Sequence, residues 1–480
     1  MSSKTLVLDL DGTLVRNDLT HELLILCLRW KPHLLLIALV TLFRSKSDGK
    51  RFLAERFGEK IEAKHLPYQQ AVLDLMEDHR SSGAAIEIVS GSDELLVRKI
   101  ADHVGVDFHK GSTPGQNLTS ISKAKFLVER HGSNFIYVGN STADYAIWQV
   151  ADRGYGVDAP SGAYNLSRDD GSKAAVTPLV EGGKSIRPLI KAMRLHQWAK
   201  NLLLFLVPAL FISSLTAISV IQLIAAFLCF SFLASSTYIL NDLFDIPDDR
   251  AHRTKHKRPL ASGRLSIPLA VLMIGLTVPV TFVLSYFISS SFSVILIAYA
   301  FATIAYSFRL KRLPIIDVFV LAGLFTGRVV AGAYVINEPP SGWLLAFIGS
   351  FFLALAIGKR YIEVRNYDAD DAIPGRGYYA ADKPILLNSG ISAGFASVIS
   401  LLIYGLLAPS VLFNFEISIF ACATILTSWL MRFWLLAGRG QINDDPVIFA
   451  IKDKTSFLTL MLIGLIFLFD ITRPFWSNQN

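Results

Sequence analysis

The stretch Asn241-Asp242-Leu243-Phe244-Asp245-Ile246-Pro247-Asp248-Asp249 follows an apolar segment, residues 217–240, that is long enough to cross a bilayer. If that segment is helical, Asp242, Asp245 and Asp249 lie three and four residues apart, on one face of its extension. Three carboxylates so close together repel one another unless a divalent cation neutralises them. Mg²⁺ takes oxygen ligands and shares them with substrate phosphates, so the stretch predicts a metal–diphosphate site.

A run of cations follows the acidic stretch and suits a phosphate-rich ligand held beside the metal. Its members are Arg250, Arg253, Lys255, Lys257, Arg258 and Arg264. Contact with anionic lipid at the membrane surface is the alternative. Lipid contact explains the bases but leaves the spaced acids unexplained, so we favour the metal–diphosphate site.

The composition divides the chain, which at 480 residues is too long for one ordinary globular domain. Hydrophobic residues make up 52% of it and the mean hydropathy is +0.44, which indicates a membrane protein. Residues 1 to about 185 have a mixed composition, and the remainder consists mostly of apolar runs broken by charged loops. The net charge of +7 gathers at the ends of those runs, so it does not indicate nucleic-acid binding.

Nine apolar stretches predict an all-α membrane bundle of about nine transmembrane helices. They lie near residues 202–212, 217–240, 266–288, 291–308, 314–336, 342–358, 390–408, 415–437 and 456–472. The loops after the even-numbered stretches hold 18 Lys and Arg, and those after the first, third, fifth and seventh hold none. Because cytoplasmic loops carry the excess of cations, we expect a multi-pass inner-membrane protein whose N-terminal domain and active-site loops are cytoplasmic.

The N-terminal part begins with an apolar strand, residues 5–10, that runs into Asp9-Leu10-Asp11-Gly12-Thr13. Parallel α/β sheets place their chemistry at the carboxyl ends of such strands. Asp9 is therefore the expected nucleophile and Asp11 the general acid and base. Residues 16–84 predict an inserted helical cap, and within it residues 33–43 form an apolar run too short to span a bilayer. We expect this run to be buried in the cap, with contact with the bilayer surface as the alternative.

This strand and its acidic turn resemble the haloacid-dehalogenase (HAD) phosphohydrolase superfamily. Ser90, which follows the strand at residues 86–89, matches the phosphate-binding hydroxyl of that family. Lys123 matches the lysine that offsets the charge of the aspartyl-phosphate, with Lys125 as the competing candidate. The resemblance implies a Rossmann-like α/β fold and a phosphatase activity.

The last strand of the HAD motif set leads into Gly139-Asn140-Ser141-Thr142-Ala143-Asp144. The resemblance implies Mg²⁺ binding by Asp9, Asp11, Asn140 and Asp144. Asn140 stands where the family usually has an acid, so one negative charge is lost and the metal affinity should fall. A working phosphatase, a weak one and a docking module are the three interpretations, and we favour activity because Asp9 and Asp11 are both present.

The membrane part resembles the UbiA superfamily of intramembrane prenyl transferases over roughly residues 185–475. The pattern Asn-Asp-x-x-Asp-x-x-x-Asp starting at Asn241 is followed by Arg258-Pro259-Leu260-Ala261-Ser262-Gly263, as in that family. Within it, the chain is most similar to the decaprenyl-phosphate phosphoribosyltransferase branch. The closer match lies in residues 197–201, 238–263, 306–311, 328–332 and 358–363.

A second acidic motif separates the branches of this superfamily. Aromatic prenylators carry a second D-x-x-x-D, whereas here Asp317 is followed four places on by Leu321. The single acid favours 5-phosphoribosyl-1-diphosphate (PRPP) as donor, with its diphosphate on the first motif and its further phosphate on cations. The resemblance implies Mg²⁺ on Asp242, Asp245 and Asp249, the first two being catalytic. The substrate-binding residues that it implies are Lys200, Asn201, Asn241, Arg258, Tyr306, Lys311, Asp317, Arg328, Lys359 and Arg360.

The expected architecture is multi-domain, with a HAD-like domain over residues 1–165, a linker over 166–190 and a UbiA-like domain over 191–475. The expected activity transfers 5-phosphoribosyl from PRPP to a polyprenyl phosphate, after which the HAD domain removes the 5-phosphate to leave polyprenyl-phosphoribose. Such a lipid-linked pentose resembles the precursor of donors for arabinose transfer to cell-surface glycans. The alternatives are prenylation of an aromatic or quinone precursor, and a transferase that carries a non-catalytic HAD module.

Overall fold

The computed structural model describes residues 4–168, 170–181, 185–367, 371, 373, 376–407, 415–442 and 446–477. The chain forms two compact units. The first comprises Met1–Arg194 with Tyr238–Leu276, and the second comprises Leu195–Thr237 with Thr277–Asn480. The acidic stretch and its basic loop therefore belong to the same unit as the N-terminal domain, whereas the sequence led us to expect a boundary near residue 190.

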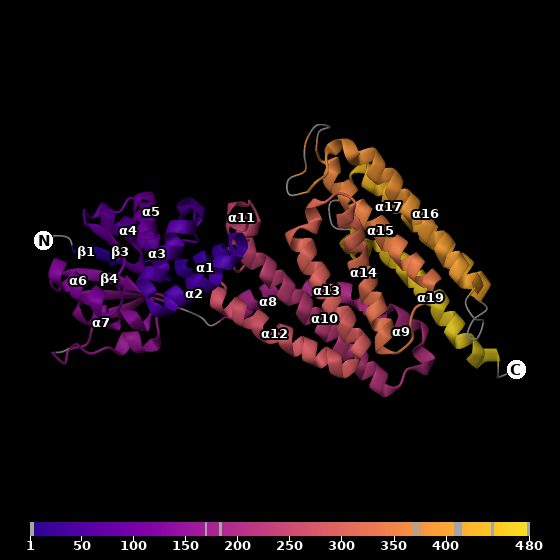
Figure 1. The fold of residues 1–480 in the computed structure, drawn as a ribbon, viewed down its shortest axis with the longest axis horizontal. Coiled ribbons are helices and arrows are strands. Elements are labelled where there is room, and N and C mark those ends of the chain that lie inside the picture. Colours follow the sequence, from indigo (N-terminus) through magenta and orange to yellow (C-terminus); the bar gives the residue numbers. More distant parts are fainter. Residues whose placement is uncertain are drawn as a thin grey trace. The chain divides into compact units, whose positions relative to one another are not determined.

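A parallel sheet of six strands forms the centre of the first unit (Figure 1). Its strands are β1 (Thr5–Leu8), β2 (Ile86–Asp93), β3 (Phe108–Ser112), β4 (Phe135–Gly139), β5 (Arg153–Val157) and β6 (Val176–Val180). Their order is β3-β2-β1-β4-β5-β6, and every neighbouring pair runs parallel. The winding reverses between β1 and β4, and in such sheets ligands bind beyond the carboxyl ends of the strands at this point.

Helices connect these strands, include the insertion expected after β1, and end with α8 after the last strand. They are α1 (Leu19–Trp30), α2 (Leu35–Arg44), α3 (Lys46–Phe57), α4 (Gln70–Ser81), α5 (Glu94–Val104), α6 (Ile121–His131), α7 (Tyr145–Val150) and α8 (Arg187–Met193). The segment expected as a linker, residues 166–190, contains β6, so the sheet continues to Val180. As an edge strand with Pro178 inside it and two exposed positions, β6 lacks the continuous apolar run of a central strand.

Helix α2 is exposed, so the expectation that its apolar run is buried in the cap was wrong. Ala38 is its one buried residue, whereas the side chains of Leu36 and Phe43 are 72% and 93% exposed. Helix α2 packs on α3 through Leu42, and a Cβ on Gly49 of α3 would lie 2.6 Å from the Leu42 backbone. Because nearly every position of α2 is apolar, its sequence periodicity does not distinguish the buried face from the exposed one.

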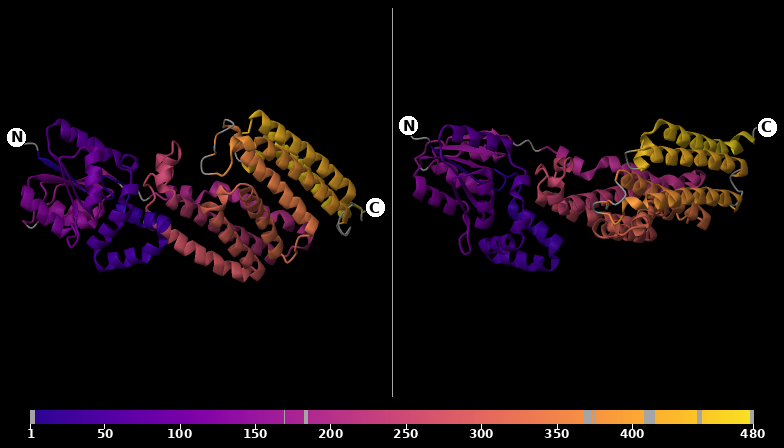
Figure 2. Two further views of the ribbon diagram at one scale, coloured as in Figure 1. Left: turned by 45° about the horizontal axis from the view of Figure 1, so that its top comes forward. Right: turned by 90° about the horizontal axis from the view of Figure 1, so that it is seen from above.

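The remainder of the described chain is helical. The helices are α9 (Leu206–Leu210), α10 (Ala217–Phe244), α11 (Ile246–Ala251), α12 (Ile267–Ile288), α13 (Ser290–Phe308), α14 (Ile316–Val335), α15 (Gly342–Arg365), α16 (Lys383–Leu407), α17 (Phe415–Arg439), α18 (Pro446–Lys452) and α19 (Lys454–Ser477). Among the described residues, α10 and α12 to α17 are the seven helices long and apolar enough to cross a membrane. Figure 2 shows α16, α17 and α19, orange to yellow, running alongside one another in the second unit.

The expected total of nine spans is not confirmed. The stretch expected to form the first span contains the end of a 3-10 helix, Leu195–Phe205, and then the five-residue α9. These elements together are too short and irregular to count among the helices that could cross a membrane. At the other end, the apolar part of α19 within the described side chains is Lys454–Ile466.

Candidate functional site

A cavity of about 410 Å³ opens beyond the carboxyl ends of β1 and β4. The residues expected from the HAD motifs all line it, namely Asp9, Asp11, Ser90, Lys123, Asn140 and Asp144. Ser266, Ile267 and Pro268, at the start of the apolar helix α12, line the same cavity. The first unit thus brings its motif residues together beside the beginning of a membrane helix.

Lys123 holds the expected nucleophile. Its Nζ donates to Oδ1 of Asp9 at 2.8 Å and to the hydroxyl of Tyr137 at 2.9 Å. Burial raises the pKa of Asp9, and the charge of Lys123 opposes this shift, which favours the ionised, nucleophilic carboxylate. Lys125, the competing candidate, is exposed on the surface of α6, whereas Lys123 is the lysine that contacts Asp9.

Asp11 is held by two donors from different elements. Its Oδ2 accepts from the hydroxyl of Ser92 at 2.5 Å, and its Oδ1 accepts from the backbone N–H of Leu19 at 2.9 Å. Burial, with a smaller effect from Asp18, raises the pKa of Asp11 to about 7. A carboxyl group that titrates near neutrality can both give and take a proton, as a general acid and base must. Sequence reasoning did not single out Ser92, although it follows Ser90 by two residues on the same strand.

Asp144 is already occupied by protein donors. Its Oδ1 accepts from the hydroxyl of Tyr137 at 2.7 Å, and its Oδ2 accepts from the backbone N–H groups of Asn140 and Ser141, both at 3.0 Å. The Asn140 side chain lies against the acidic turn, because a Cβ on Gly12 would approach its Nδ2 to 2.0 Å. Asp144 therefore shapes the loop that presents Asn140 to the cavity.

Oxygen donors suited to Mg²⁺ remain in this cavity. The described residues contain no group of three or more His, Cys, Asp or Glu side chains placed to hold a metal ion. Asp9 and Asn140 nevertheless both line the cavity and offer a carboxylate and an amide oxygen. Mg²⁺ commonly binds one or two protein oxygens and keeps several waters, so this donor set fits it.

The acidic stretch at the end of α10 is bridged by arginine. Oδ1 of Asp242 accepts from Arg194 and, at 3.1 Å, from Nη1 of Arg258. The same Arg258 nitrogen donates to Oδ2 of Asp249 at 2.7 Å. Burial raises the pKa of Asp249, and the charge of Arg258 opposes the shift. A guanidinium thus lies where two buried carboxylates require positive charge.

Helical backbone hydrogen bonds run through the acidic stretch. The N–H of Asp245 donates to the carbonyl of Asn241 at 2.9 Å, and that of Asp249 donates to the carbonyl of Asp245 at 2.7 Å. Helix α11 then starts at Ile246 with Pro247 in its first turn, a position that proline tolerates. Asp242, Asp245 and Asp249 supply only oxygen donors, which fits Mg²⁺ by type.

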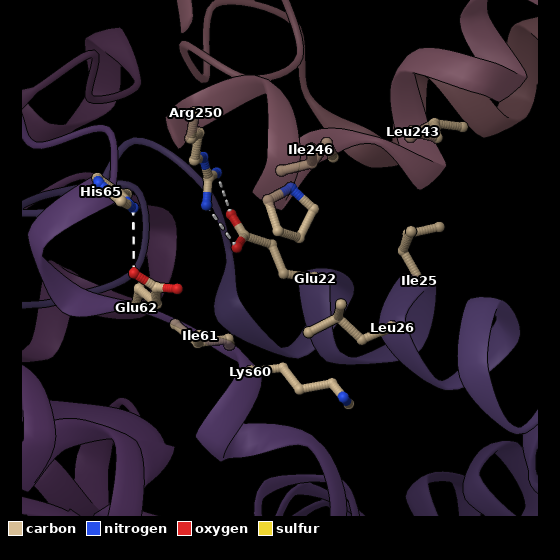
Figure 3. Close-up of a pocket in the computed structure, with 11 residues that line it drawn as sticks. Glu22, Ile25, Leu26, Lys60, Ile61, Glu62, His65, Leu243, Ile246 and Arg250 are labelled. Atoms are coloured by element: carbon tan, nitrogen blue, oxygen red, sulfur yellow. Dashed lines mark hydrogen bonds and ion pairs between the residues drawn. The ribbon is translucent and has the colours of Figure 1, made fainter. Parts of the chain in front are cut away.

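A buried ion pair joins the acidic stretch to the cap. The guanidinium of Arg250 donates through two nitrogens to the two carboxylate oxygens of Glu22 on α1, at 2.9 and 2.6 Å. Figure 3 shows this pair among the residues that line a small pocket, together with Ile61, Leu243 and Ile246. Nothing in the local sequence around Glu22 indicated the pair, because its two members belong to elements far apart in the chain.

In the second unit, Arg360 is the centre of a buried network. It donates to Oδ2 of Asp317, to Glu363 and, at 2.7 Å, to the hydroxyl of Tyr306. The hydroxyl of Tyr378 donates to Oδ1 of Asp317 at 2.6 Å. Asp317 and Arg360 have no exposed surface, so in this arrangement they position Tyr306 and Glu363.

A second buried network surrounds Arg328. It donates to Oδ1 of Asn201 at 2.9 Å and to the hydroxyl of Tyr299 at 2.6 Å. Lys200 lies over the ring of Phe325, 5.9 Å from its centroid. The two remaining expected cations are Lys311, in a 3-10 turn after α13, and Lys359, half-buried on α15. The residues expected in this unit therefore fall into the Arg360 network, the Arg328 network and these lysines.

The chain combines two kinds of protein, an α/β domain and a helical membrane protein. A doubly wound parallel sheet with Asp9 and Asp11 after its first strand has a Rossmann-like, HAD-like fold, and the apolar helices form a multi-pass membrane protein. The profile of the UbiA prenyltransferase family matches residues 202–467, more than half of the chain. The chain belongs to the UbiA prenyltransferase family.

Known proteins resemble the chain over different parts. It is 35% identical to the uncharacterized protein y4nM of Sinorhizobium fredii, over 96% of this chain and 90% of that protein. It is 34% identical to the decaprenyl-phosphate phosphoribosyltransferase of Mycolicibacterium smegmatis over 37% of this chain, which spans 57% of that relative. A structure of phosphoserine phosphatase in its apo form aligns with 15% identity and a TM-score of 0.28, over 40% of this chain and 98% of that one.

Proposed function

We propose that the protein transfers 5-phosphoribosyl from PRPP to a polyprenyl phosphate and then removes the 5-phosphate from the product. The observation that carries the transferase proposal is the arginine-bridged acidic stretch, in which Arg258 joins Asp242 and Asp249. This stretch offers carboxylates that can bind a metal–diphosphate and arginine side chains that can bind phosphate. The similarity to a decaprenyl-phosphate phosphoribosyltransferase supports the same substrate class.

The contacts of Asp317 favour a glycosyl-donor substrate that binds to only one acidic motif. Both of its carboxylate oxygens are engaged, one by Arg360 and one by the hydroxyl of Tyr378. Asp317 is fully buried against the Arg360 guanidinium, so a second metal ion would have to displace a cation that already neutralises this acid. This site therefore fits PRPP better than a prenyl diphosphate, which two acid pairs bind in the aromatic prenylators.

In the transfer, an oxygen of the polyprenyl phosphate attacks the anomeric carbon of the ribose, and the bond from that carbon to the diphosphate breaks. Asp242, Asp245 and Asp249 would hold Mg²⁺, which when bound neutralises the leaving diphosphate. Arg258 and Arg194, which contact Asp242, would bind phosphate oxygens of the substrate beside the metal ion. The acceptor is already anionic, so the residues contribute positioning and charge neutralisation rather than a strong base.

In the second reaction, the carboxylate of Asp9 attacks the 5-phosphate, and the ribose oxygen leaves with a proton from Asp11. Water, deprotonated by Asp11, then hydrolyses the aspartyl-phosphate and releases inorganic phosphate. Lys123 offsets the negative charge beside Asp9, and the Ser90 hydroxyl binds phosphate. Ser266 to Pro268, at the start of α12, line this cavity, which favours a substrate presented at the membrane.

We infer a cytoplasmic location for the HAD domain and the cationic loops. The loops between spans that carry Lys and Arg alternate with loops that carry none, and cytoplasmic loops hold the excess of cations. PRPP would then reach the acidic stretch from the cytoplasm. Labelling single introduced cysteines with a membrane-impermeant thiol reagent in intact cells tests this orientation.

The deciding experiment uses membranes that contain the protein, Mg²⁺, polyprenyl phosphate and PRPP labelled with carbon isotope in the ribose. The extracted lipids are analysed by mass. A labelled lipid without the 5-phosphate supports both reactions, and Asp9→Asn should then leave the 5-phosphate in place. A labelled lipid that keeps the phosphate in the unchanged protein overturns the phosphatase proposal alone. No labelled lipid overturns the transferase proposal and points to prenyl diphosphates with aromatic acceptors.

A further inference from the structure

The exposed side of α2 is a continuous apolar stripe. Its members are Leu36, Ile37, Leu39, Val40 and Phe43, between 43% and 93% exposed. On a helix these positions fall within one side, opposite Ala38, whose burial fixes the side that faces the rest of the cap. Soluble surfaces seldom expose such a row of large apolar side chains without a binding partner.

Cations frame the stripe at both ends. Lys31 precedes α2, Arg44 ends it and Lys46 follows, and all three are exposed. No Asp or Glu occurs between Leu23 and Ser47. An apolar helix side with a purely cationic frame is complementary to a bilayer that contains anionic lipid.

The same unit is anchored at a bilayer by its own chain. It contains Ile267–Leu276, the beginning of the apolar helix α12, and the residues at the start of that helix line the HAD cavity. A lipid surface is therefore present beside this unit, and no additional protein is needed to explain what covers the stripe.

We propose that α2 is a membrane-docking helix, which lies in the interfacial layer of an anionic bilayer with the side defined by Leu36, Ile37, Leu39, Val40 and Phe43 facing the acyl chains. This role is independent of the reactions that the chain catalyses. It gives the HAD domain a second attachment to the membrane, in addition to its covalent link.

The test places a fluorescent reporter on the stripe in the full chain. The three native cysteines, Cys27, Cys229 and Cys422, are buried, so Phe43→Cys can be labelled selectively with an environment-sensitive fluorophore. The protein is reconstituted in vesicles of phosphatidylcholine and phosphatidylglycerol, with or without lipids that carry a spin-label quencher near the headgroup. Asp78→Cys, at an exposed position on α4, is the matched control.

The expected result is a blue-shifted emission and strong lipid quenching at position 43, with neither at position 78. No lipid quenching at position 43 overturns the proposal, and a blue shift without lipid quenching overturns it in favour of a protein partner. Arg44→Glu should shift the docked equilibrium about fivefold or more toward the undocked state in anionic vesicles, whereas Arg98→Glu on α5 should not. Equal effects of the two reversals would contradict the electrostatic part of the proposal. Circular dichroism of each reconstituted variant checks that it is folded.

Discussion

Arg250 and Glu22, which are 228 positions apart, form a two-pronged ion pair with nitrogen–oxygen distances of 2.9 and 2.6 Å. Both side chains are buried, with 6% and 5% of their surface exposed. Glu22 also accepts from the side-chain amide of Asn17 at 3.0 Å, and Nε of Arg250 donates to the carbonyl of Ala261 at 3.0 Å. The pair therefore connects the cap helix α1 with α11 and with the loop that contains Arg258.

Glu22→Gln should lower both the stability and the transferase activity, although Glu22 touches no substrate. Removing one partner of a buried pair leaves the other charge uncompensated, at a cost of about 3–5 kcal/mol. Thermal unfolding can be followed by the reaction of the buried cysteines with a fluorogenic thiol reagent. Glu77→Gln is the control, because its partner Arg80 is exposed and such pairs contribute about 0–1 kcal/mol. Equal thermal unfolding midpoints for Glu22→Gln and Glu77→Gln would show that the ion pair of Glu22 does not stabilise the protein.

Replacing both partners separates stability from positioning. Glu22→Leu combined with Arg250→Met removes both charges, and such apolar replacements are often neutral or stabilising. We expect the double variant to recover most of the stability lost in Glu22→Gln but to keep a reduced kcat with PRPP. Full recovery of kcat would mean that the pair has only a structural role.

Asp242→Asn should reduce the formation of labelled lipid by about 100-fold or more, because it removes a proposed ligand of the metal that neutralises the leaving group. Asp248→Asn is a control within the same acidic stretch. Asp248 is exposed and pairs with Arg29, so its loss should change the rate no more than a few-fold. Comparable losses in the two variants would argue that overall negative charge, rather than the position of Asp242, is what matters.

Lys123→Met should abolish phosphate release from the lipid product, whereas Lys125→Met should leave it nearly unchanged. The Nζ of Lys123 lies 2.8 Å from Oδ1 of Asp9, and Lys125 is exposed on α6. The quantity to measure is inorganic phosphate released per labelled lipid formed. The role assigned to Lys123 is wrong if Lys125→Met lowers phosphate release more than Lys123→Met does.

The HAD site was largely predictable because its information is local. Asp9 and Asp11 follow a buried strand, Ser90 belongs to the neighbouring strand of the sheet, and Lys123 and Asp144 lie in segments that match the family motifs; all of them line one cavity. The contacts that hold these groups were not predictable in the same way. The Arg250 and Glu22 pair depends on how distant elements pack, and no periodicity within either segment carries that information.

The errors in the fold have equally specific causes. The α2 run is apolar at almost every position, so a periodic signal was absent and its exposed side could be assigned only from packing. The strand β6 was missed because an edge strand with Pro178 does not resemble a central strand. The expected first span was wrong because its apolar residues form the end of a 3-10 helix, up to Phe205, and then only the five-residue α9, although the apolar composition continues.

Asn140→Asp should strengthen Mg²⁺ binding at the HAD cavity, because it restores a charged oxygen beside Asp9. We expect a lower Mg²⁺ concentration for half-maximal phosphate release, by about tenfold if the added charge interacts with the ion at short range. Calorimetric titration of Mg²⁺ into the Asp242→Asn background isolates this site and does not depend on turnover. Unchanged binding would mean that residue 140 does not contact the ion.

Gly332→Ala on α14 should destabilise the membrane unit, whereas Gly327→Ala on the same helix should not. A Cβ at Gly332 would lie 1.7 Å from the carbonyl oxygen of Leu204, a backbone atom that cannot move aside alone, whereas a Cβ at Gly327 has no neighbour within 4 Å. Such overpacking costs about 1–3 kcal/mol or more, while alanine in an open helical position is neutral or favourable by up to about 1 kcal/mol. The measurement is the thermal exposure of Cys229 and Cys422, both in this unit. If both variants expose these cysteines at the same temperature, the 3-10 segment that contains Leu204 does not pack against α14 at Gly332.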